Sequence, residues 1–240
     1  MRIDLNSDMG ESFGTWVIGA DAELLKVVSS ANIACGAHAG DPAVLRGTVR
    51  AAKAAGVSIG AHPGFPDLAG FGRREMRMSP REIEDSVIFQ IAALAGVAVV
   101  EGARLAHVKP HGALYNMAAQ DQPMADAIAA AIAAVDRALV MVGLPASALE
   151  RAAEKAGLSF AAEGFADRAY EPDGTLVSRS KPGALITDPD AAAAGALRLA
   201  RAGRVRTICI HSDTPHAAAI GAAVRRAFDE NGITLKGLGA

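Results

Sequence analysis

The sequence has few of the residues and patterns that mark several common classes of protein. Only two of its 240 residues are cysteine, Cys35 and Cys209, and both lie inside apolar segments far apart in the chain. They fit reduced structural thiols better than a disulfide framework, and they lack the paired spacing of zinc ligands. Basic residues are not in excess either, since 24 of them face 26 acidic ones. This balance argues against a nucleic-acid partner.

Long hydrophobic runs are also lacking. The longest covers residues 87–100, is interrupted by Gln90 and is too short to cross a bilayer as a helix. The chain turns polar at Asp4, so its first residues lack the apolar core of a secretory signal. We therefore expect a cytoplasmic protein without a membrane segment. Neither a dinucleotide-binding nor a Walker glycine pattern follows the first expected strand.

What the chain does contain is an alternation of helix signals and short apolar runs. Asp41-Pro42, Asp188-Pro189 and Thr214-Pro215 each combine a helix N-cap with proline at the first helical position. The apolar runs between the helical stretches predict seven strands, at residues 3–6, 32–35, 57–61, 105–109, 139–142, 159–162 and 205–211. Strands that are apolar on both faces and alternate with helices are typical of a parallel sheet covered by helices.

The length then favours one barrel. A chain of 240 residues that is 51% hydrophobic can bury roughly 70% of its unfolded surface in a single core, and no linker divides it. We predict one domain over residues 1–240, an α/β closed or incomplete barrel of about seven parallel strands, with a doubly wound open sheet as the alternative. Residues 170–180 predict two extended arms around the turn Pro172-Asp173-Gly174, placed as a flap over the barrel mouth.

Polar residues collect at the carboxyl ends of the predicted strands and in the loops that follow. In a parallel barrel these ends converge on one mouth, so residues scattered along the sequence would become neighbours. All six histidines belong to this set. Its members, in chain order, are Asp4, Asn6, Asp8, Glu11, His38, Asp41, His62, His107, Lys109, His111, Asn116, Glu163, Asp167, Arg168, His211, Asp213 and His216.

The residue types suit two kinds of chemistry, and their spacing does not choose between them. Asp8, His38 and His62 follow three consecutive strands, and one carboxylate with two imidazoles would serve either as divalent metal ligands or in proton transfer. Lys109 and Arg168 would suit a site for an anion.

Several of these residues also have a purely structural interpretation. Asp41 is most simply a helix cap, and Asp4 alternates with Asn6 so that it would satisfy polar groups inside the barrel. Glu163 would form an ion pair with Arg168. The whole cluster indicates a site, although each of these residues alone is explained without one.

Five blocks of the chain resemble the signature blocks of the LamB/YcsF family. They are Asp4-Leu-Asn-Ser-Asp-Met-Gly-Glu11, Asn32-Ile-Ala-Cys-Gly-Ala-His-Ala-Gly-Asp41, Gly60-Ala-His-Pro-Gly-Phe-Pro-Asp67, Val108-Lys-Pro-His-Gly-Ala-Leu-Tyr-Asn116 and Phe165-Ala-Asp-Arg168. The resemblance implies an incomplete (β/α) TIM-like barrel of the glycoside hydrolase/deacetylase type. It also implies the A subunit of bacterial 5-oxoprolinase, with ATP-dependent opening of 5-oxoproline to L-glutamate and two partner subunits, B and C.

Lactam opening with phosphate transfer needs cations, a base for water and an acid for the departing nitrogen. On this basis we assign Asp8, His38, His62 and His111 to catalysis, with Asp8 and His38 or His62 in proton transfer and His111 in orientation. Binding of substrate or phosphate is assigned to Asn6, Lys109, Asn116, Arg168 and Asp213.

The sequence leaves open which subunit binds the nucleotide, what effect Ser212 has, and which of three functions the chain performs. Magnesium is expected with ATP, but no local motif shows which polypeptide of the complex binds the nucleotide. Ser212 stands where the family usually has glycine, beside His211 and Asp213. The alternatives are a stand-alone metal-dependent hydrolase or deacetylase, with Asp8, His38 and His62 as candidate metal ligands, and a scaffold subunit without catalysis.

Overall fold

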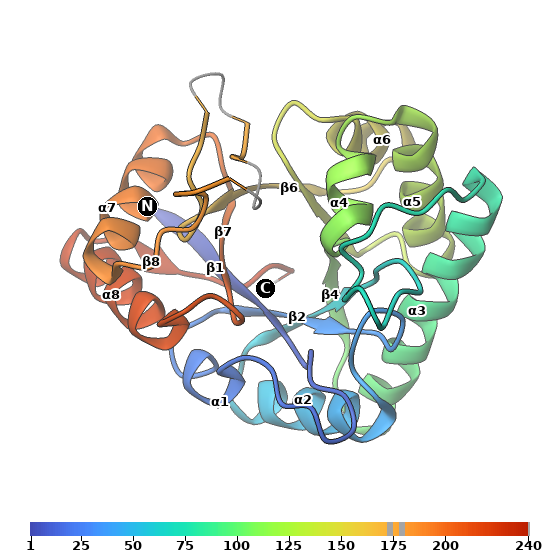
Figure 1. Ribbon diagram of the computed structural model, residues 1–240, viewed down its shortest axis with the longest axis horizontal. Helices are drawn as coiled ribbons and strands as arrows, with labels where there is room; N and C mark the ends of the chain where they lie inside the picture. Colours follow the sequence, from blue (N-terminus) through green and yellow to red (C-terminus); the bar gives the residue numbers. More distant parts are fainter. Residues whose placement is uncertain (172–174, 178–180, 240) are drawn as a thin grey trace.

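The strands form a closed barrel at the centre of the molecule, with the helices around it (Figure 1). The structure is a computed structural model that describes residues 1–171, 175–177 and 181–239. The barrel strands are β1 (Arg2–Met9), β2 (Ser30–Ala34), β3 (Ser58–His62), β4 (Leu105–Val108), β5 (Val140–Gly143), β6 (Phe160–Phe165) and β7 (Thr207–His211). Each pairs in parallel with the next, and β1 pairs with both β2 and β7.

The predicted seven-stranded parallel barrel is therefore confirmed, and the doubly wound alternative is wrong because pairing of β1 with β2 and β7 leaves no open sheet. All seven predicted strands are present with shifts of a few residues at their ends. The largest differences are in β1 and β6, and β1 runs to Met9 and so carries Asp8 within the strand.

The helices follow the strands in the expected alternation. The longer ones are α2 (Pro42–Ala54), α3 (Pro80–Val100), α5 (Gln122–Val135), α6 (Ala148–Ala156), α7 (Pro189–Ala202) and α8 (Ala217–Glu230), and two short ones are α1 (Asp21–Leu24) and α4 (Gly112–Ala118). Asp41 caps α2 by accepting from the amides of Ala43 and Val44, and Asp188 caps α7 by accepting from the amide of Ala191.

The predicted start of the last helix at Thr214-Pro215 is wrong. Helix α8 begins at Ala217 after His216, whose φ of 65° is in the left-handed region. The hydroxyl of Thr214 donates to Asp167 at 2.6 Å, and His216 stands at the N-cap position of α8 without a side-chain cap hydrogen bond.

A short strand that the sequence did not predict, β8 (Thr234–Leu235), pairs with the start of β1. The residues after it cover the end of the barrel where the strands begin. Leu238 packs there against Val140, Val142 and Ala161, and its amide donates to Ser30. Figure 1 shows this carboxyl-terminal end near the middle of the barrel. The chain thus closes the barrel floor with its own last residues.

The predicted flap is described only in part, because the turn at 172–174 lies outside the described residues. Its flanks pair in antiparallel fashion between Tyr170 and Leu176, and a second bridge joins Arg168 to Leu185. These flanks border the mouth of the barrel, since Tyr170, Leu176 and Arg168 line the cavity there.

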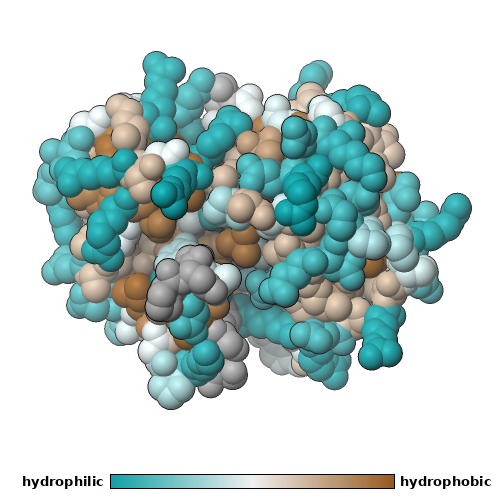
Figure 2. Space-filling model, turned by 90° about the horizontal axis from the view of Figure 1, so that it is seen from above, coloured by the Kyte–Doolittle hydropathy of each residue, from teal (hydrophilic) through white to brown (hydrophobic). Residues whose placement is uncertain are grey.

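Helix α3 is the longest helix in the described part of the chain. Its 21 residues make it long and apolar enough to cross a membrane by length and composition, although the apolar run was expected to be too short. In the barrel, Ile83, Val87, Ile91 and Leu94 are buried, and the helix packs on α5. The view in Figure 2 shows hydrophobic patches between hydrophilic residues that cover most of the visible surface.

We expect Gly60→Ala to destabilise the barrel. A Cβ at this position would overlap the imidazole of His107 inside the barrel, where neither group has room to move. Overpacking of this kind costs about 1–3 kcal/mol, and here also disturbs the bond from His107 to Asn32. Urea denaturation measures the free energy of unfolding.

The matched control is Gly47→Ala, at an exposed position inside α2 where a Cβ would meet nothing within 4 Å. It should stabilise the protein by roughly 0.5–1 kcal/mol, as alanine does for glycine within a helix. Equal stability of the two variants would contradict the close contact between Gly60 and His107.

Candidate functional site

A cavity of about 1650 Å³ opens at the end of the barrel where the strands terminate. Its inner surface comes from five strands and the loops after them, and includes Asp8, His62, Lys109, Glu163 and His211. The predicted convergence of distant strand ends on one mouth is therefore what the structure shows.

The ammonium group of Lys109 is the central charge of this cavity. Its Nζ lies 3.0 Å from Asp8 Oδ1 and 2.9 Å from Glu163 Oε1, and it also donates to Cys209 Sγ at 3.0 Å. The side chains of Lys109, Asp8 and Glu163 are at most 6% exposed. Two buried carboxylates thus share one buried cation.

Mutual attraction shifts the pKa values of Asp8 and Lys109 toward their charged forms. Burial opposes ionisation of Asp8, but the charges of His62 and Lys109 outweigh it and hold the pKa of Asp8 well below its usual range. Burial likewise opposes the charged form of Lys109, but Asp8 and Glu163 hold its pKa well above the usual value. Tyr115 completes the group by donating its hydroxyl to Glu163 at 2.9 Å.

Below this level the barrel interior is filled by a polar network. Asn6 donates to Glu163, and Asn32 donates to both Asn6 and Asp8. His107 contacts Asn32 through Nε2 at 2.8 Å, and burial lowers the pKa of His107 to about 3. At the bottom, Asp4 accepts from the hydroxyls of Ser29, Ser30 and Thr207, which confirms its interpretation as an interior polar group.

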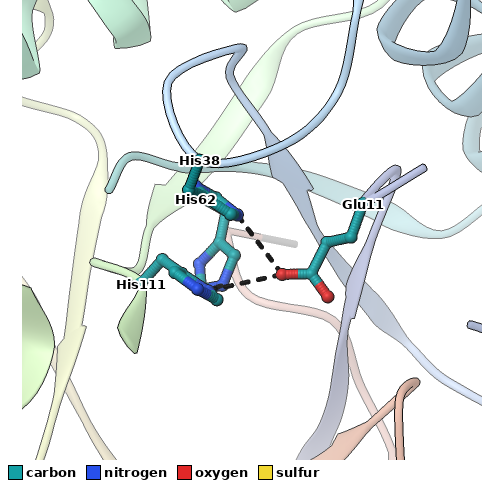
Figure 3. A group of neighbouring side chains, drawn as sticks. All are labelled: Glu11, His38, His62 and His111. Carbon is teal, nitrogen blue, oxygen red and sulfur yellow. Dashed lines mark hydrogen bonds and ion pairs between the residues drawn. The ribbon is translucent and has the colours of Figure 1, made fainter. Parts of the chain in front are cut away.

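A second cluster joins Glu11, His38, His62 and His111 beside the cavity (Figure 3). Glu11 Oε1 lies 3.3 Å from His38 Nε2 and 3.3 Å from His111 Nδ1. His111 Nδ1 is 3.0 Å from His62 Nε2, and His62 Nε2 is 3.5 Å from Asp8 Oδ1. The cluster therefore touches the Lys109 group through Asp8.

Burial has opposite effects on the two residue types of this cluster. It lowers the pKa of His38 and His111 well below the usual value, so both imidazoles are neutral at neutral pH. Burial and the nearby charge of Asp8 raise the pKa of Glu11 to about 7.

On the other side of Lys109, Asp167 and His211 form a dyad. Both carboxylate oxygens of Asp167 lie 3.0 Å from His211 Nδ1, and Asp167 also accepts from the hydroxyl of Thr214. Because a carboxylate of lowered pKa only accepts, Nδ1 carries the proton and Nε2 is left for another partner. The ring stacks on Phe165 and lines the cavity, so this histidine is oriented for proton transfer.

The remaining predicted binding residues lie farther out. Arg168 lines the cavity and donates to the carbonyl of Val177 at 2.6 Å. Asn116 also lines it, on the exposed side of α4. Asp213 pairs with Arg73 at 2.6 Å across the rim.

This arrangement joins a fixed cation, an ionised carboxylate and oriented imidazoles around one open space. Such a set can bind an anionic molecule, activate water and deliver a proton.

Comparison with models of protein families shows to which family the chain belongs. The model of the LamB/YcsF family matches residues 3–240. The chain belongs to the LamB/YcsF family.

Curated relatives extend over nearly the whole LamB/YcsF chain. It is 51% identical to the 5-oxoprolinase A subunit of Heliobacterium modesticaldum, with 98% of each chain covered. It is 53% identical to the 5-oxoprolinase A subunit of Methylococcus capsulatus, with 99% of this chain and 96% of the relative covered.

Solved structures show the same barrel. The lactam utilization protein of Thermus thermophilus is 47% identical, and the match covers 99% of this chain and 100% of that chain with a TM-score of 0.94. The catalytic domain of a peptidoglycan N-acetylglucosamine deacetylase from Eubacterium rectale has a TM-score of 0.56 at 11% identity, with 99% and 88% covered. The second likeness extends to the fold alone.

Within this LamB/YcsF barrel, the structure brings together most residues that the sequence selected. Successive contacts connect Asn6 to Lys109, Lys109 to Asp8, Asp8 to His62, and His62 to His111. His38 joins them through Glu11 and through its stacking on the ring of His111. Asn116 and Asp213 lie at the periphery. The expectation that all six histidines share the rim is wrong, because His107 is buried beneath it and His216 is exposed outside it.

Sequence reasoning assigned no site role to Glu11, Tyr115, Glu163, Asp167 or His211. Glu163 was expected to pair with Arg168, whereas it binds Lys109 and Tyr115. The signal for Glu11 and His211 was present, since both stood among the polar residues near strand ends. What was missing was the identity of their partners.

We expect Lys109→Met to reduce the free energy of unfolding by about 3–5 kcal/mol, because it leaves Asp8 and Glu163 buried without their shared cation. Adding Glu163→Gln to Lys109→Met should restore part of this loss. Chemical denaturation of both variants and of Glu163→Gln alone completes the cycle.

Lys155→Met is the matched control. It removes an exposed lysine that pairs with Asp126, and should cost no more than about 1 kcal/mol. If Lys109→Met were as mild as this surface change, the buried charges would not depend on Lys109.

Proposed function

We propose that this chain is the A subunit of an ATP-dependent 5-oxoprolinase, which opens the lactam ring of 5-oxoproline to give L-glutamate together with subunits B and C. The observation that carries the proposal is the group of Lys109, Asp8 and His62 on the floor of the cavity, where a cation and a carboxylate–imidazole pair meet. The near full-length similarity to proteins named as the A subunit of 5-oxoprolinase supports the choice of substrate.

The chemistry explains why ATP is needed. A lactam amide is stabilised by resonance, so its carbonyl carbon is a poor electrophile. Transfer of the γ-phosphoryl group to the lactam oxygen releases ADP and makes that carbon electrophilic. One water then adds, the C–N bond breaks as the nitrogen takes a proton, and an acyl phosphate remains. A second water hydrolyses it to glutamate and phosphate.

The residues of the cavity divide these tasks. Lys109 and Arg168 face anionic oxygens of substrate or phosphate, and Asp8, with His62 held beside it, takes the proton of the attacking water. His211, held by Asp167, takes up a proton on Nε2 and delivers it to the departing nitrogen. His111 and Asn6 orient His62 and Glu163 respectively. Asn116 and Asp213 act at the rim, and His38 acts through its contact with Glu11.

The size of the cavity is compatible with more than one reactant. Its volume of about 1650 Å³ exceeds the range of about 300–1000 Å³ that is usual for a single small-molecule site. ATP brings magnesium, which is bound by oxygen ligands including those of the phosphates. We place the enzyme in the cytoplasm, where ATP is available to it.

A metal-dependent hydrolase that works alone is the second candidate. The cluster of Glu11 with three histidines favours it, since such side chains hold catalytic metals. The two candidates differ in whether turnover needs ATP and partner subunits.

The direct test is formation of glutamate from 5-oxoproline. We expect the reconstituted three-subunit complex to form glutamate and ADP in step, and to lose both when this chain or ATP is omitted. Turnover of 5-oxoproline by this chain alone without ATP would favour the second candidate. Full activity of the complex without this chain would refute the proposal.

We expect Asp8→Asn to lower the rate of the complex by about 10²–10⁴-fold, the usual range for loss of a general base. The amide cannot accept the water proton, although it keeps the size of the side chain. Steady-state kinetics with the three subunits measures the effect.

The control is Asp126→Asn, which removes a surface carboxylate paired with Lys155 and should leave the rate unchanged. Co-purification of each variant with the partner subunits shows that assembly is intact. Near-normal turnover of Asp8→Asn in an intact complex would support the scaffold role in place of catalysis.

A further inference from the structure

Four buried side chains from four separate loops and strands point at one another beside the cavity. Glu11 follows β1, His38 follows β2, His62 ends β3 and His111 follows β4. Each is at most 2% exposed. Figure 3 shows the carboxylate of Glu11 facing the imidazoles, with contacts to His38 and His111.

Backbone carbonyls set the protonation of two of these rings. His62 Nδ1 lies 2.7 Å from the carbonyl oxygen of Lys109, and His111 Nε2 lies 2.8 Å from that of Phe71. A carbonyl oxygen only accepts, so each of these nitrogens carries a hydrogen. When each ring holds this single hydrogen, His62 Nε2 and His111 Nδ1 present lone pairs.

These two lone pairs face each other at 3.0 Å, and Glu11 Oε1 is a third acceptor 3.3 Å from His111 Nδ1. No hydrogen bond can form between acceptors, so the arrangement needs a positive centre between them. A proton shared by the rings is one such centre. A metal ion is the other, and it accounts for the carbonyl contacts as well, since metal-bound histidines are held by a bond from the opposite ring nitrogen.

The distances match those around a metal ion. Two ligand atoms bound to zinc at about 2.1 Å lie about 3.4 Å apart at a tetrahedral angle. The observed separations are 3.3 Å from Glu11 Oε1 to His38 Nε2 and to His111 Nδ1, and 3.0 Å between the facing nitrogens of His111 and His62. All four ligand atoms lie within 4.8 Å of one another.

The charges of the neighbouring groups also leave a place for a cation. Lys109 is already shared between Asp8 and Glu163, and the guanidinium of Arg73 is bonded to Asp213. The partners of the Glu11 carboxylate are the histidines His38 and His111, which are not permanent cations as lysine and arginine are. A divalent ion would balance the Glu11 carboxylate and the part of the Asp8 charge that Lys109 does not offset.

We infer that Glu11, His38, His62 and His111 form a binding site for a divalent transition metal, zinc or a similar ion. Three imidazole nitrogens and one carboxylate oxygen suit such an ion, whereas magnesium takes oxygen ligands. The site is therefore distinct from the magnesium that accompanies ATP. The ligands expected from sequence were Asp8, His38 and His62. The inferred site shares His38 and His62 with that set, and it contains Glu11 and His111 instead of Asp8.

The experiment uses the purified full chain without ATP, substrate or partners, so its outcome is independent of the proposed function. The protein is stripped with a chelator and titrated with zinc, followed by elemental analysis, calorimetry and thermal unfolding. We expect one zinc per chain and a rise in Tm with zinc concentration. Cobalt in place of zinc should give the visible absorption of a site with nitrogen and oxygen ligands.

Variants then locate the ion. Glu11→Gln and His111→Asn should each weaken zinc binding by more than about 100-fold, since loss of an outer contact alone costs 10–100-fold. The control His216→Asn removes an exposed histidine outside the cluster and should bind zinc normally. Cys209→Ser tests the other possible group, Asp8 with Cys209 and His211, and should also leave zinc binding unchanged.

Three outcomes would overturn the inference. The first is a chain that binds no zinc, which would leave a shared proton between His62 and His111. The second is unchanged binding in Glu11→Gln and His111→Asn. The third is loss of binding in Cys209→Ser alone, which would move the ion to the other group. Circular dichroism of each stripped variant shows whether a loss reflects unfolding.

Discussion

The buried ammonium of Lys109 is the interaction on which the mouth of the barrel depends. Removing a cation and two carboxylates from water costs several kcal/mol per ion, and only close, well-bonded pairing offsets it. Lys109 meets that condition by contacting Asp8, Glu163 and Cys209, from β1, β6 and β7. Its carbonyl oxygen also holds the ring of His62 on β3. Lys109, which directly follows β4, thus links four other strands.

This central charge divides the cavity floor into two unlike halves. Toward β2 to β4 the neighbours are Glu11 and three histidines, two of which are kept neutral by burial. Toward β6 and β7 the neighbours are Asp167 and His211, where a carboxylate orients an imidazole. Lys109 and Asp8 lie between the two halves. Histidine therefore has different chemistry on the two sides, because its partners differ.

Much of this architecture follows from local rules. Caps such as Asp41 and the alternation of apolar strands with helices predicted the barrel, because those signals depend on neighbours in sequence. The rule that parallel strands end at one mouth brought Asp8, His62 and Lys109 together correctly. The same rule was wrong for His107, which lies two residues before Lys109 and points into the barrel at a deeper level.

The remaining features depend on partners that only the folded chain supplies. Glu11 follows Gly10, whose φ of 67° is left-handed and at which an added Cβ would lie 3.1 Å from the hydroxyl of Thr48, so the loop needs glycine there. Thr214 was expected to cap a helix, but its hydroxyl donates to Asp167, 47 residues away in sequence. Tyr115 and Glu163 meet inside the barrel although neither sequence segment indicates the other. The spacing of residues along the chain does not predict such pairs.

The closed barrel floor has a practical consequence for handling the protein. Leu238 fills the space between Val140 and Ala161, and a Cβ at Gly239 would lie 2.9 Å from the methyl group of Ala106. A purification tag joined after these residues would begin next to the packed side chain of Leu238. Met1 is 62% exposed, so a fusion at the amino terminus begins at an open position of the surface.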